Sequence, residues 1–248
     1  MGESGTFSFF GRVHPERAAA AIGEVSLQHR SQFINFEIDI FTHGSQLLVQ
    51  VHPESEVEDL DTLQNLVQSS VSSITDPFAF IYGKHVSVEI TGAITPSGSK
   101  RVFGIEHGYI AEKTTQNGEA DEWYGKILDV YSTDAAPYLQ RAFRDYRLAL
   151  EHAEDTGFYC FRSIESLRQF YKESDDTESW ERLRSDIEVS RETIEQGIQI
   201  YAKDRRHGDV YSLSGEERKE ILETTWTILS SFIDRLSEQA EDGSNEPE

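Results

Sequence analysis

Residues 33–41 read Phe-Ile-Asn-Phe-Glu-Ile-Asp-Ile-Phe, and their apolar and polar side chains alternate with a period of two. Successive side chains of a strand point to opposite faces, so the even-numbered residues from Ile34 to Ile40 share one face. The polar residues between them share the other face. This pattern predicts a half-buried strand, and with it a sheet in the first half of the chain.

Other signals extend this sheet and add a helix. The turn His43-Gly44-Ser45 leads into the next alternating segment. Similar alternation predicts strands over 6–13, 46–52, 85–91 and 101–105. From Leu60 to Ile81, apolar residues recur at three- and four-residue spacings, which predicts a helix that bends or breaks near Pro77. Residues 1–130 are therefore predicted to form a small α+β domain, with one main helix on a sheet of four or five strands.

The second half of the chain has a helical period throughout. Four amphipathic stripes predict helices over 135–153, 158–171, 178–204 and 214–236. The last of these starts at Ser214, with Glu217 three residues on, which is the spacing of a capping box. We expect an antiparallel four-helix bundle over residues 131–237. Residues 238–248 are rich in acidic and small polar residues and are expected to form a disordered acidic tail.

Composition limits the classes of function. Asp and Glu number 45 against 23 Lys and Arg, a net charge of −22, which argues against non-specific binding of DNA or RNA. The longest apolar runs have five residues, so no membrane span is expected. The single cysteine, Cys160, is expected to be a small buried apolar side chain, and we predict a cytoplasmic protein. No motif for a cofactor or a metal is found, so neither is expected.

The stretch Lys203-Asp204-Arg205-Arg206-His207-Gly208-Asp209 concentrates cations in an otherwise acidic chain. It has a structural interpretation, because cations are favourable at the C-terminal end of a helix and Gly208 can end that helix. It also has a functional interpretation, in which the arginines bind phosphate and His207 transfers a proton near neutral pH. The two interpretations are compatible, because a histidine at the end of a helix can also take part in catalysis.

Residues 134–236 resemble a HEPN domain, in particular its ApeA-like branch. The resemblance is carried by Phe158-Tyr159-Cys160-Phe161-Arg162-Ser163-Ile164-Glu165-Ser166-Leu167, by Arg206-His207-Gly208-Asp209 and by the segment 214–236. It implies a four-helix bundle that forms a homodimer. In many members an arginine precedes a histidine by four to six intervening residues, and the pair cleaves RNA without a metal at the dimer interface.

His207 matches the histidine of that pair, but the arginine positions are occupied by Ile200, Tyr201 and Ala202. The resemblance therefore implies a non-catalytic or weakly catalytic module in a prokaryotic RNA-linked or defence pathway. The resemblance does not extend to the N-terminal domain, which we expect to supply recognition. A metal-independent ribonuclease or toxin that uses His207 with Arg205 or Arg206 is the first alternative. A structural dimerisation or assembly protein is the second.

The predicted site has a binding part and a supporting part. Lys203, Arg205 and Arg206 are predicted to form a local basic pocket for RNA or a nucleotide. Asp204, Gly208 and Glu165 are predicted to support it. Glu165 is flanked by apolar residues, and a partly buried carboxylate needs a partner. Two alternatives are open: a bond across helices to Arg205 or Arg206, or a pair with Arg162 or Arg168 on its own helix.

Overall fold

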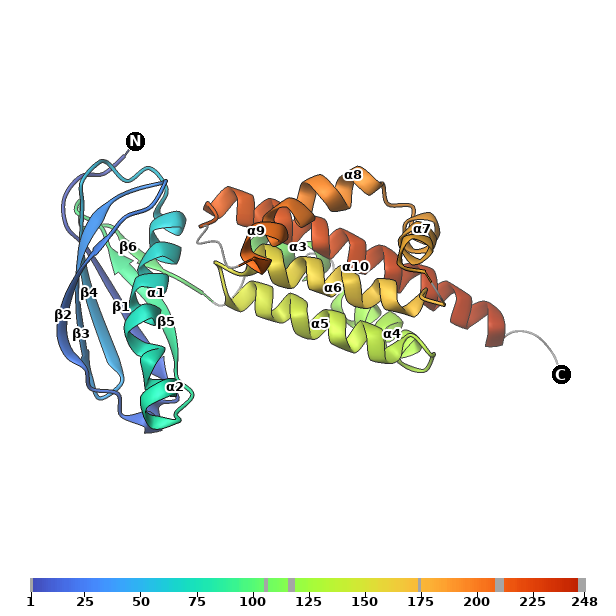
Figure 1. The fold of residues 1–248 in the computed structure, drawn as a ribbon, viewed down its shortest axis with the longest axis horizontal. Helices are drawn as coiled ribbons and strands as arrows, with labels where there is room; N and C mark the ends of the chain where they lie inside the picture. Colours follow the sequence, from blue (N-terminus) through green and yellow to red (C-terminus); the bar gives the residue numbers. More distant parts are fainter. Residues whose placement is uncertain (1, 105–106, 116–118, 174, 208–211, 245–248) are drawn as a thin grey trace. The chain divides into compact units, whose positions relative to one another are not determined.

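The computed structural model describes residues 2–104, 107–115, 119–173, 175–207 and 212–244. The side chains of residues 79, 115, 204–206 and 240–244 are outside this description. The chain divides into two compact units, Met1–Ile105 and Glu106–Glu248. The first unit contains a sheet and helices and the second is helical, which confirms the predicted α+β class with two domains (Figure 1).

The first unit is built on an antiparallel sheet of six strands, in the order β2-β3-β4-β1-β5-β6. The strands are β1 (Phe7–His14), β2 (Gly23–His29), β3 (Phe36–His43), β4 (Gln46–Pro53), β5 (Ser87–Ile94) and β6 (Lys100–Val102). The prediction of four or five strands missed β2. The segment contains only two apolar side chains, Val25 and Leu27, and neither is fully buried, so its pairing with β3 is what defines it.

The turn between β3 and β4 follows the prediction. Gly44 and Ser45 both have positive φ angles, 57° and 64°, as a two-residue turn of the tightest hairpin type requires. The Ser45 side chain is buried, and its hydroxyl accepts a hydrogen bond from the backbone N–H of Ala20 at 3.0 Å. This bond offsets the cost of a non-glycine residue in the left-handed region.

Helix α1 (Leu60–Thr75) packs its apolar stripe on the sheet, and a short α2 (Pro77–Tyr82) follows it. The Asp59 carboxylate caps α1 by accepting hydrogen bonds from the N–H groups of Asp61 and Thr62, at 2.9 and 3.2 Å. The predicted interruption is confirmed, because Pro77 stands at the first position of α2, where its missing N–H costs no hydrogen bond.

The second unit contains more helices than the four predicted. They are α3 (Gly108–Thr115), α4 (Ala120–Tyr131), α5 (Ala136–Glu151), α6 (Thr156–Phe170), α7 (Asp176–Asp186), α8 (Arg191–Ile194), a π-helical segment (Glu195–Gln199), α9 (Ile200–Arg206) and α10 (Gly215–Ser244). The division between units lies after Ile105 rather than at residue 130. The reason is that α3 and α4 pack on the helical core, with the Trp123 and Trp226 rings 5.7 Å apart.

The helix predicted over 178–204 is not continuous. Helix α7 ends at Asp186, Glu188 has a positive φ of 55°, and the Ser190 hydroxyl caps a new helix by accepting from the N–H of Thr193 at 3.0 Å. Ile187 and Ile194 are both buried in the same core. Their seven-residue spacing preserves the apolar stripe across the break, so the sequence pattern does not reveal it.

Helix α10 begins as predicted and ends later. The Ser214 hydroxyl accepts from the N–H of Glu217 at 3.1 Å, and the Glu217 carboxylate accepts from the N–H of Ser214 at 2.8 Å, which confirms the capping box. The disordered tail predicted from residue 238 is wrong up to Ser244, because the helix-forming run Glu238–Asp242 continues α10. In the described part of the chain, no helix combines the length and apolarity that a membrane crossing needs.

Candidate functional site

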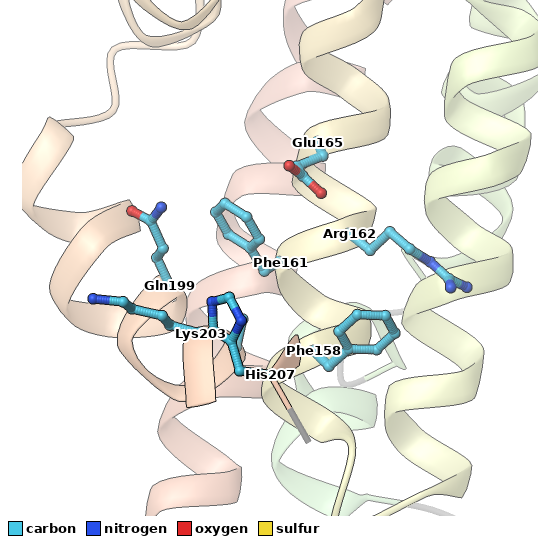
Figure 2. Close-up of a pocket in the computed structure, with 8 residues that line it drawn as sticks. Phe158, Phe161, Arg162, Glu165, Gln199, Lys203 and His207 are labelled. Atoms are coloured by element: carbon cyan, nitrogen blue, oxygen red, sulfur yellow. The ribbon is translucent and has the colours of Figure 1, made fainter. Parts of the chain in front are cut away.

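A pocket of about 300 Å³ lies in the second unit, on α6 and the segment that ends in α9 (Figure 2). It is lined by Phe158, Phe161, Arg162, Glu165, Gln199, Ala202, Lys203 and His207. The three predicted site residues Glu165, Lys203 and His207 therefore meet at one pocket, although they are up to 42 positions apart in the sequence.

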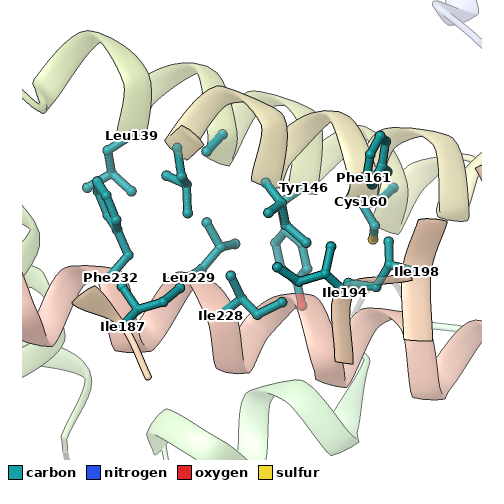
Figure 3. Close-up of a cluster of buried hydrophobic side chains, with 14 of the residues drawn as sticks. Leu139, Tyr146, Cys160, Phe161, Ile187, Ile194, Ile198, Ile228, Leu229 and Phe232 are labelled. Atoms are coloured by element: carbon teal, nitrogen blue, oxygen red, sulfur yellow. The ribbon is translucent and has the colours of Figure 1, made fainter. Parts of the chain in front are cut away.

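One wall of the pocket is a single face of α6. Phe161 and Arg162 lie three and four residues after Phe158, and Glu165 lies four and three residues after them, which places all four on one face over consecutive turns. Phe161 is 8% exposed, and Figure 3 shows its ring beside Cys160 and Ile198 in the core. This wall is therefore held by the hydrophobic core beneath it and is rigid on the side that faces the pocket.

The other wall is formed by Gln199, Lys203 and His207, which are spaced four residues apart. Gln199 is the last residue of the π-helical segment, and Lys203 lies on α9, which ends one residue before His207. A π segment has a wider turn than an α-helix, and such segments occur frequently at functional sites. The side chains of Gln199, Lys203 and His207 are all exposed, so this wall is open to solvent.

A glycine brings the two walls together. Gly157 lies in the first turn of α6, and a Cβ atom built there would be 2.7 Å from the Cβ of Tyr201 on α9. No real side chain tolerates this distance, so the close approach of α9 to α6 requires glycine. The pocket above this contact therefore depends on Gly157.

Arg162 lines the pocket, but its guanidinium is bound elsewhere. Its Nε donates to Asp145 Oδ2 on α5 at 2.9 Å, and a second nitrogen donates to Asp145 Oδ1. The guanidinium also lies over the rings of Phe158 and Tyr159. The hydrogen bond to Asp145 raises the pKa of Arg162 above its usual value, so it is always charged. Figure 2 shows it directed toward α5 and away from Glu165.

Neither same-helix partner predicted for Glu165 is observed. Arg162 pairs with Asp145, and Arg168 pairs with Asp176 at 2.8 Å and donates to the Ser179 hydroxyl at 3.3 Å. Both arginines find acceptors on other helices, and these compete successfully with a surface pair worth a few tenths of a kcal/mol. Within the described side chains, Glu165 makes no hydrogen bond and no ion pair.

The other predicted site residues are less fully described. The backbone of Asp204, Arg205 and Arg206 forms the end of α9, but their side chains are outside the described residues, as is all of Gly208. The cross-helix bond from Glu165 to Arg205 or Arg206 therefore stays a prediction. Cys160 is fully buried, as predicted, and burial raises the pKa of its thiol to about 12, so it is not a nucleophile near neutral pH.

Phe158, Phe161 and Gln199 were not predicted as site residues. The two phenylalanines lie on the apolar stripe of the predicted helix 158–171, and Phe161 belongs to the core. The available signal was that both share a helix face with Glu165, an acidic residue in an apolar stripe. Gln199 had no comparable signal, because its position follows from the π segment.

The described residues do not assemble a metal site, since no three His, Cys, Asp or Glu side chains among them come together. The pocket itself offers one carboxylate, one imidazole, one amine and one amide. This donor set suits hydrogen bonding to an organic anion better than chelation of a metal ion.

Comparison with known protein families matches both units. Residues 7–103 match the model described as the N-terminal domain of a domain of unknown function, DUF8168, and residues 124–237 match the model of its C-terminal domain. The chain belongs to the DUF8168 family. In the DUF8168 arrangement the pocket lies entirely within the C-terminal domain. The descriptions of DUF8168 state no activity and no relation to HEPN domains.

Two further comparisons gave no match for this DUF8168 chain. No curated protein and no solved structure is similar to it at a significant level.

Proposed function

We propose that this DUF8168 protein is a non-catalytic, HEPN-type module that binds RNA or a nucleotide in the pocket on α6 and α9. The observation that supports the proposal is the composition of this pocket. Phe158 and the small exposed part of Phe161, both on α6, line the same 300 Å³ as Lys203 and His207 from the α9 segment. Stacking on aromatic rings and contact with cations are the two interactions by which proteins hold unpaired nucleotides.

Charge supports a local site rather than a broad binding surface. The chain carries −22, so it repels a phosphate backbone on average. Lys203 is exposed beside the pocket with no carboxylate within ion-pairing distance among the described residues, and it is free to bind a phosphate. We therefore expect weak, salt-sensitive binding of one or two nucleotides and no binding of duplex DNA.

The ion pair and the orientation of Arg162 favour binding over cleavage. The guanidinium of Arg162 is occupied by a buried carboxylate and is directed away from the pocket. Positions 200–202, where the HEPN resemblance calls for an arginine, hold Ile200, Tyr201 and Ala202. Without a guanidinium aimed at the phosphate, the charge that develops during cleavage lacks its stabiliser.

The ribonuclease remains the second candidate because the exposed His207 lines the pocket. In that role His207 acts as general base on the ribose 2′-hydroxyl, with the cation from Arg205 or Arg206. The third candidate is an assembly protein that forms a homodimer through the helical unit. In this role the pocket has no function. The cytoplasm and an RNA-linked or defence pathway stay predictions from the sequence.

Recognition of a partner is assigned to the N-terminal domain in this proposal. Phe41, Leu48 and Phe10 are direct cross-strand neighbours on β3, β4 and β1. Their side chains are 49%, 47% and 38% exposed, and they alternate with the residues that pack on α1. An exposed apolar row of this kind is typical of a surface that contacts another molecule.

Binding is tested by fluorescence anisotropy with a labelled single-stranded hexaribonucleotide at several salt concentrations. Lys203→Ala is expected to weaken binding and to reduce the slope of log K against log salt by about 0.7, the value for one phosphate contact on a single strand. Lys100→Ala, an exposed lysine on β6 of the other unit, is the matched control and is expected to leave the slope unchanged.

The same samples distinguish the binding module from the ribonuclease and from the assembly protein. Cleavage of the labelled RNA without metal, lost in His207→Ala, would replace the binding module with the ribonuclease. No binding by the wild-type protein, together with a stable dimer in analytical ultracentrifugation, would favour the assembly protein.

A further inference from the structure

The two ends of the pocket have opposite hydrogen-bonding character. In Figure 2 the Glu165 carboxylate and the Gln199 amide lie at one end, on either side of the Phe161 ring. His207 lies at the other end, between Phe158 and Lys203, and the Lys203 amine is directed away from Phe158, toward the side of Gln199. One end therefore offers acceptors and an amide, and the other offers the Lys203 ammonium group and the His207 imidazole. A fitting ligand carries donors at one end and negative charge at the other.

The acceptor end is anchored on a rigid helix. Glu165 lies seven residues after Phe158, which is about 10 Å along α6 at 1.5 Å per residue. This length separates a phosphate beside Lys203 and His207 from the far edge of a base stacked on Phe158. The base is placed on Phe158 because the ring of Phe161 is itself stacked on Trp180. The Glu165 side chain is half-buried, and its predicted partners Arg162 and Arg168 are bound to Asp145 and Asp176. Its two oxygens are thus available to a ligand, as far as the described residues show.

Among the bases, guanine matches this end best. Its outer edge carries two adjacent donors, the ring N1–H and the exocyclic amine, and an ionised carboxylate accepts both. Beside them is the O6 acceptor, which suits the amide N–H₂ of Gln199. Adenine and cytosine offer the carboxylate one amine next to an unprotonated ring nitrogen, and that lone pair repels it.

We propose that Glu165 makes the pocket selective for guanine nucleotides by accepting hydrogen bonds from N1–H and the exocyclic amine, with Gln199 donating to O6. The inference rests on the proposed nucleotide binding and adds its base specificity. Lys203 and His207 bind the phosphate and contribute equally for every base. Glu165 is a specificity-determining residue in this assignment.

The test is isothermal titration of the full-length protein with GMP, IMP, AMP and CMP. GMP is expected to bind about tenfold more tightly than AMP or CMP, the discrimination of one bidentate contact. IMP lacks the exocyclic amine and is expected to bind with intermediate affinity. Glu165→Gln is expected to abolish the difference between GMP and AMP, while Lys203→Ala weakens all four ligands by the same factor.

Glu192→Gln, an exposed glutamate on α8 away from the pocket lining, is the matched control and is expected to keep the preference for GMP. Circular dichroism verifies that each variant folds. If all four nucleotides bind equally, or if Glu165→Gln keeps the GMP preference, the proposed role of Glu165 in guanine selectivity is wrong. The proposed nucleotide binding is not contradicted by either result. If none of the four and no RNA binds, the proposed function itself fails.

Discussion

The side chain of Asp145 is completely buried, and its carboxylate binds the guanidinium of Arg162 from the neighbouring helix through two hydrogen bonds. Arg141 on the same helix as Asp145 adds a third bond at 3.2 Å. A buried carboxylate persists only where cations and donors compensate the loss of water. This cluster therefore fixes α5 to α6 and holds the arginine at the edge of the pocket.

Asp145→Ala is expected to destabilise the protein by about 3–5 kcal/mol, because it breaks a buried pair and leaves two arginines without their acceptor. The measurement is the free energy of unfolding from urea denaturation. Glu151→Ala removes the exposed partner of Arg147 on the same helix and is expected to cost about 0.5 kcal/mol at most. Equal costs for the two variants would contradict this account of the buried pair.

Gly157→Ala is expected to lower the free energy of unfolding by about 1–3 kcal/mol, because the added Cβ overlaps Tyr201 and pushes α9 away from α6. Gly125→Ala is the control with the opposite sign. Gly125 lies in α4, nothing lies within 4 Å of its added Cβ, and alanine there is expected to stabilise by about 0.5–1 kcal/mol. A stabilising Gly157→Ala would show that the two helices separate without cost.

Arg218→Met is expected to destabilise the protein by about 1–3 kcal/mol. The Arg218 guanidinium on α10 donates to the carbonyl of Leu150 at 2.6 Å and to the Thr156 hydroxyl at 3.1 Å, so it caps the end of α5. Methionine keeps the apolar stem and removes both donors, so that among the described residues the Leu150 carbonyl retains only the longer contact with His107 Nε2 at 3.3 Å. Arg191→Met, at an exposed arginine with one pair along its helix, is expected to change stability by less than about 0.5 kcal/mol.

The stability of the first unit is expected to fall as the pH drops through about 6.5, because of His29. The Ser70 hydroxyl donates to the carbonyl of Leu66 at 2.8 Å, so it accepts from Nδ1–H of His29 at 3.0 Å. Nε2 is then the unprotonated nitrogen, and it is buried without a hydrogen-bond partner among the described residues. Burial lowers the pKa of His29 below its usual 6.5.

The direction of this change in stability with pH follows from proton binding in the folded and unfolded states. The unfolded chain protonates His29 around pH 6.5, whereas burial lowers the pKa of His29 in the native state, so the unfolded chain binds more protons in this range and acid favours unfolding. The free energy of unfolding, measured from pH 7.5 to 5.5, should decrease less in His29→Gln than in the wild type. His85→Gln, at an exposed histidine, should retain the full decrease. Parallel curves for wild type and His29→Gln would contradict this role.

Local signals in the sequence predicted much of the fold. The capping box at Ser214, the tight turn at Gly44 and the start of α2 at Pro77 each depend on a few adjacent residues. Strand β2 and the break after Asp186 were missed because tertiary pairing decides the first and an unbroken apolar spacing hides the second. In such cases the sequence pattern fits two structures equally well.

Three residues that line the candidate site were predicted from the sequence, but the way in which they come together was not. The polar character of Glu165, Lys203 and His207 marked them within their own segments. Their meeting at one pocket depends on Gly157, whose need for glycine arises from Tyr201 on a helix distant in the sequence. Likewise the orientation of Arg162 is set by Asp145, seventeen positions earlier. Such contacts between helices leave no periodic signal in either segment.

The π-helical segment Glu195–Gln199 has a consequence for how this protein can change over evolution. Each residue of an α-helix turns the chain by about 100°, so one deletion there would rotate Lys203 and His207 by that amount about their axis. The side chains of Lys203 and His207 would then leave the pocket, while the residues of α6 that form its other wall would keep their positions. A single codon therefore decides whether Lys203 and His207 line this pocket, and relatives of the chain that differ in length at this point are expected to differ in the side chains that line it.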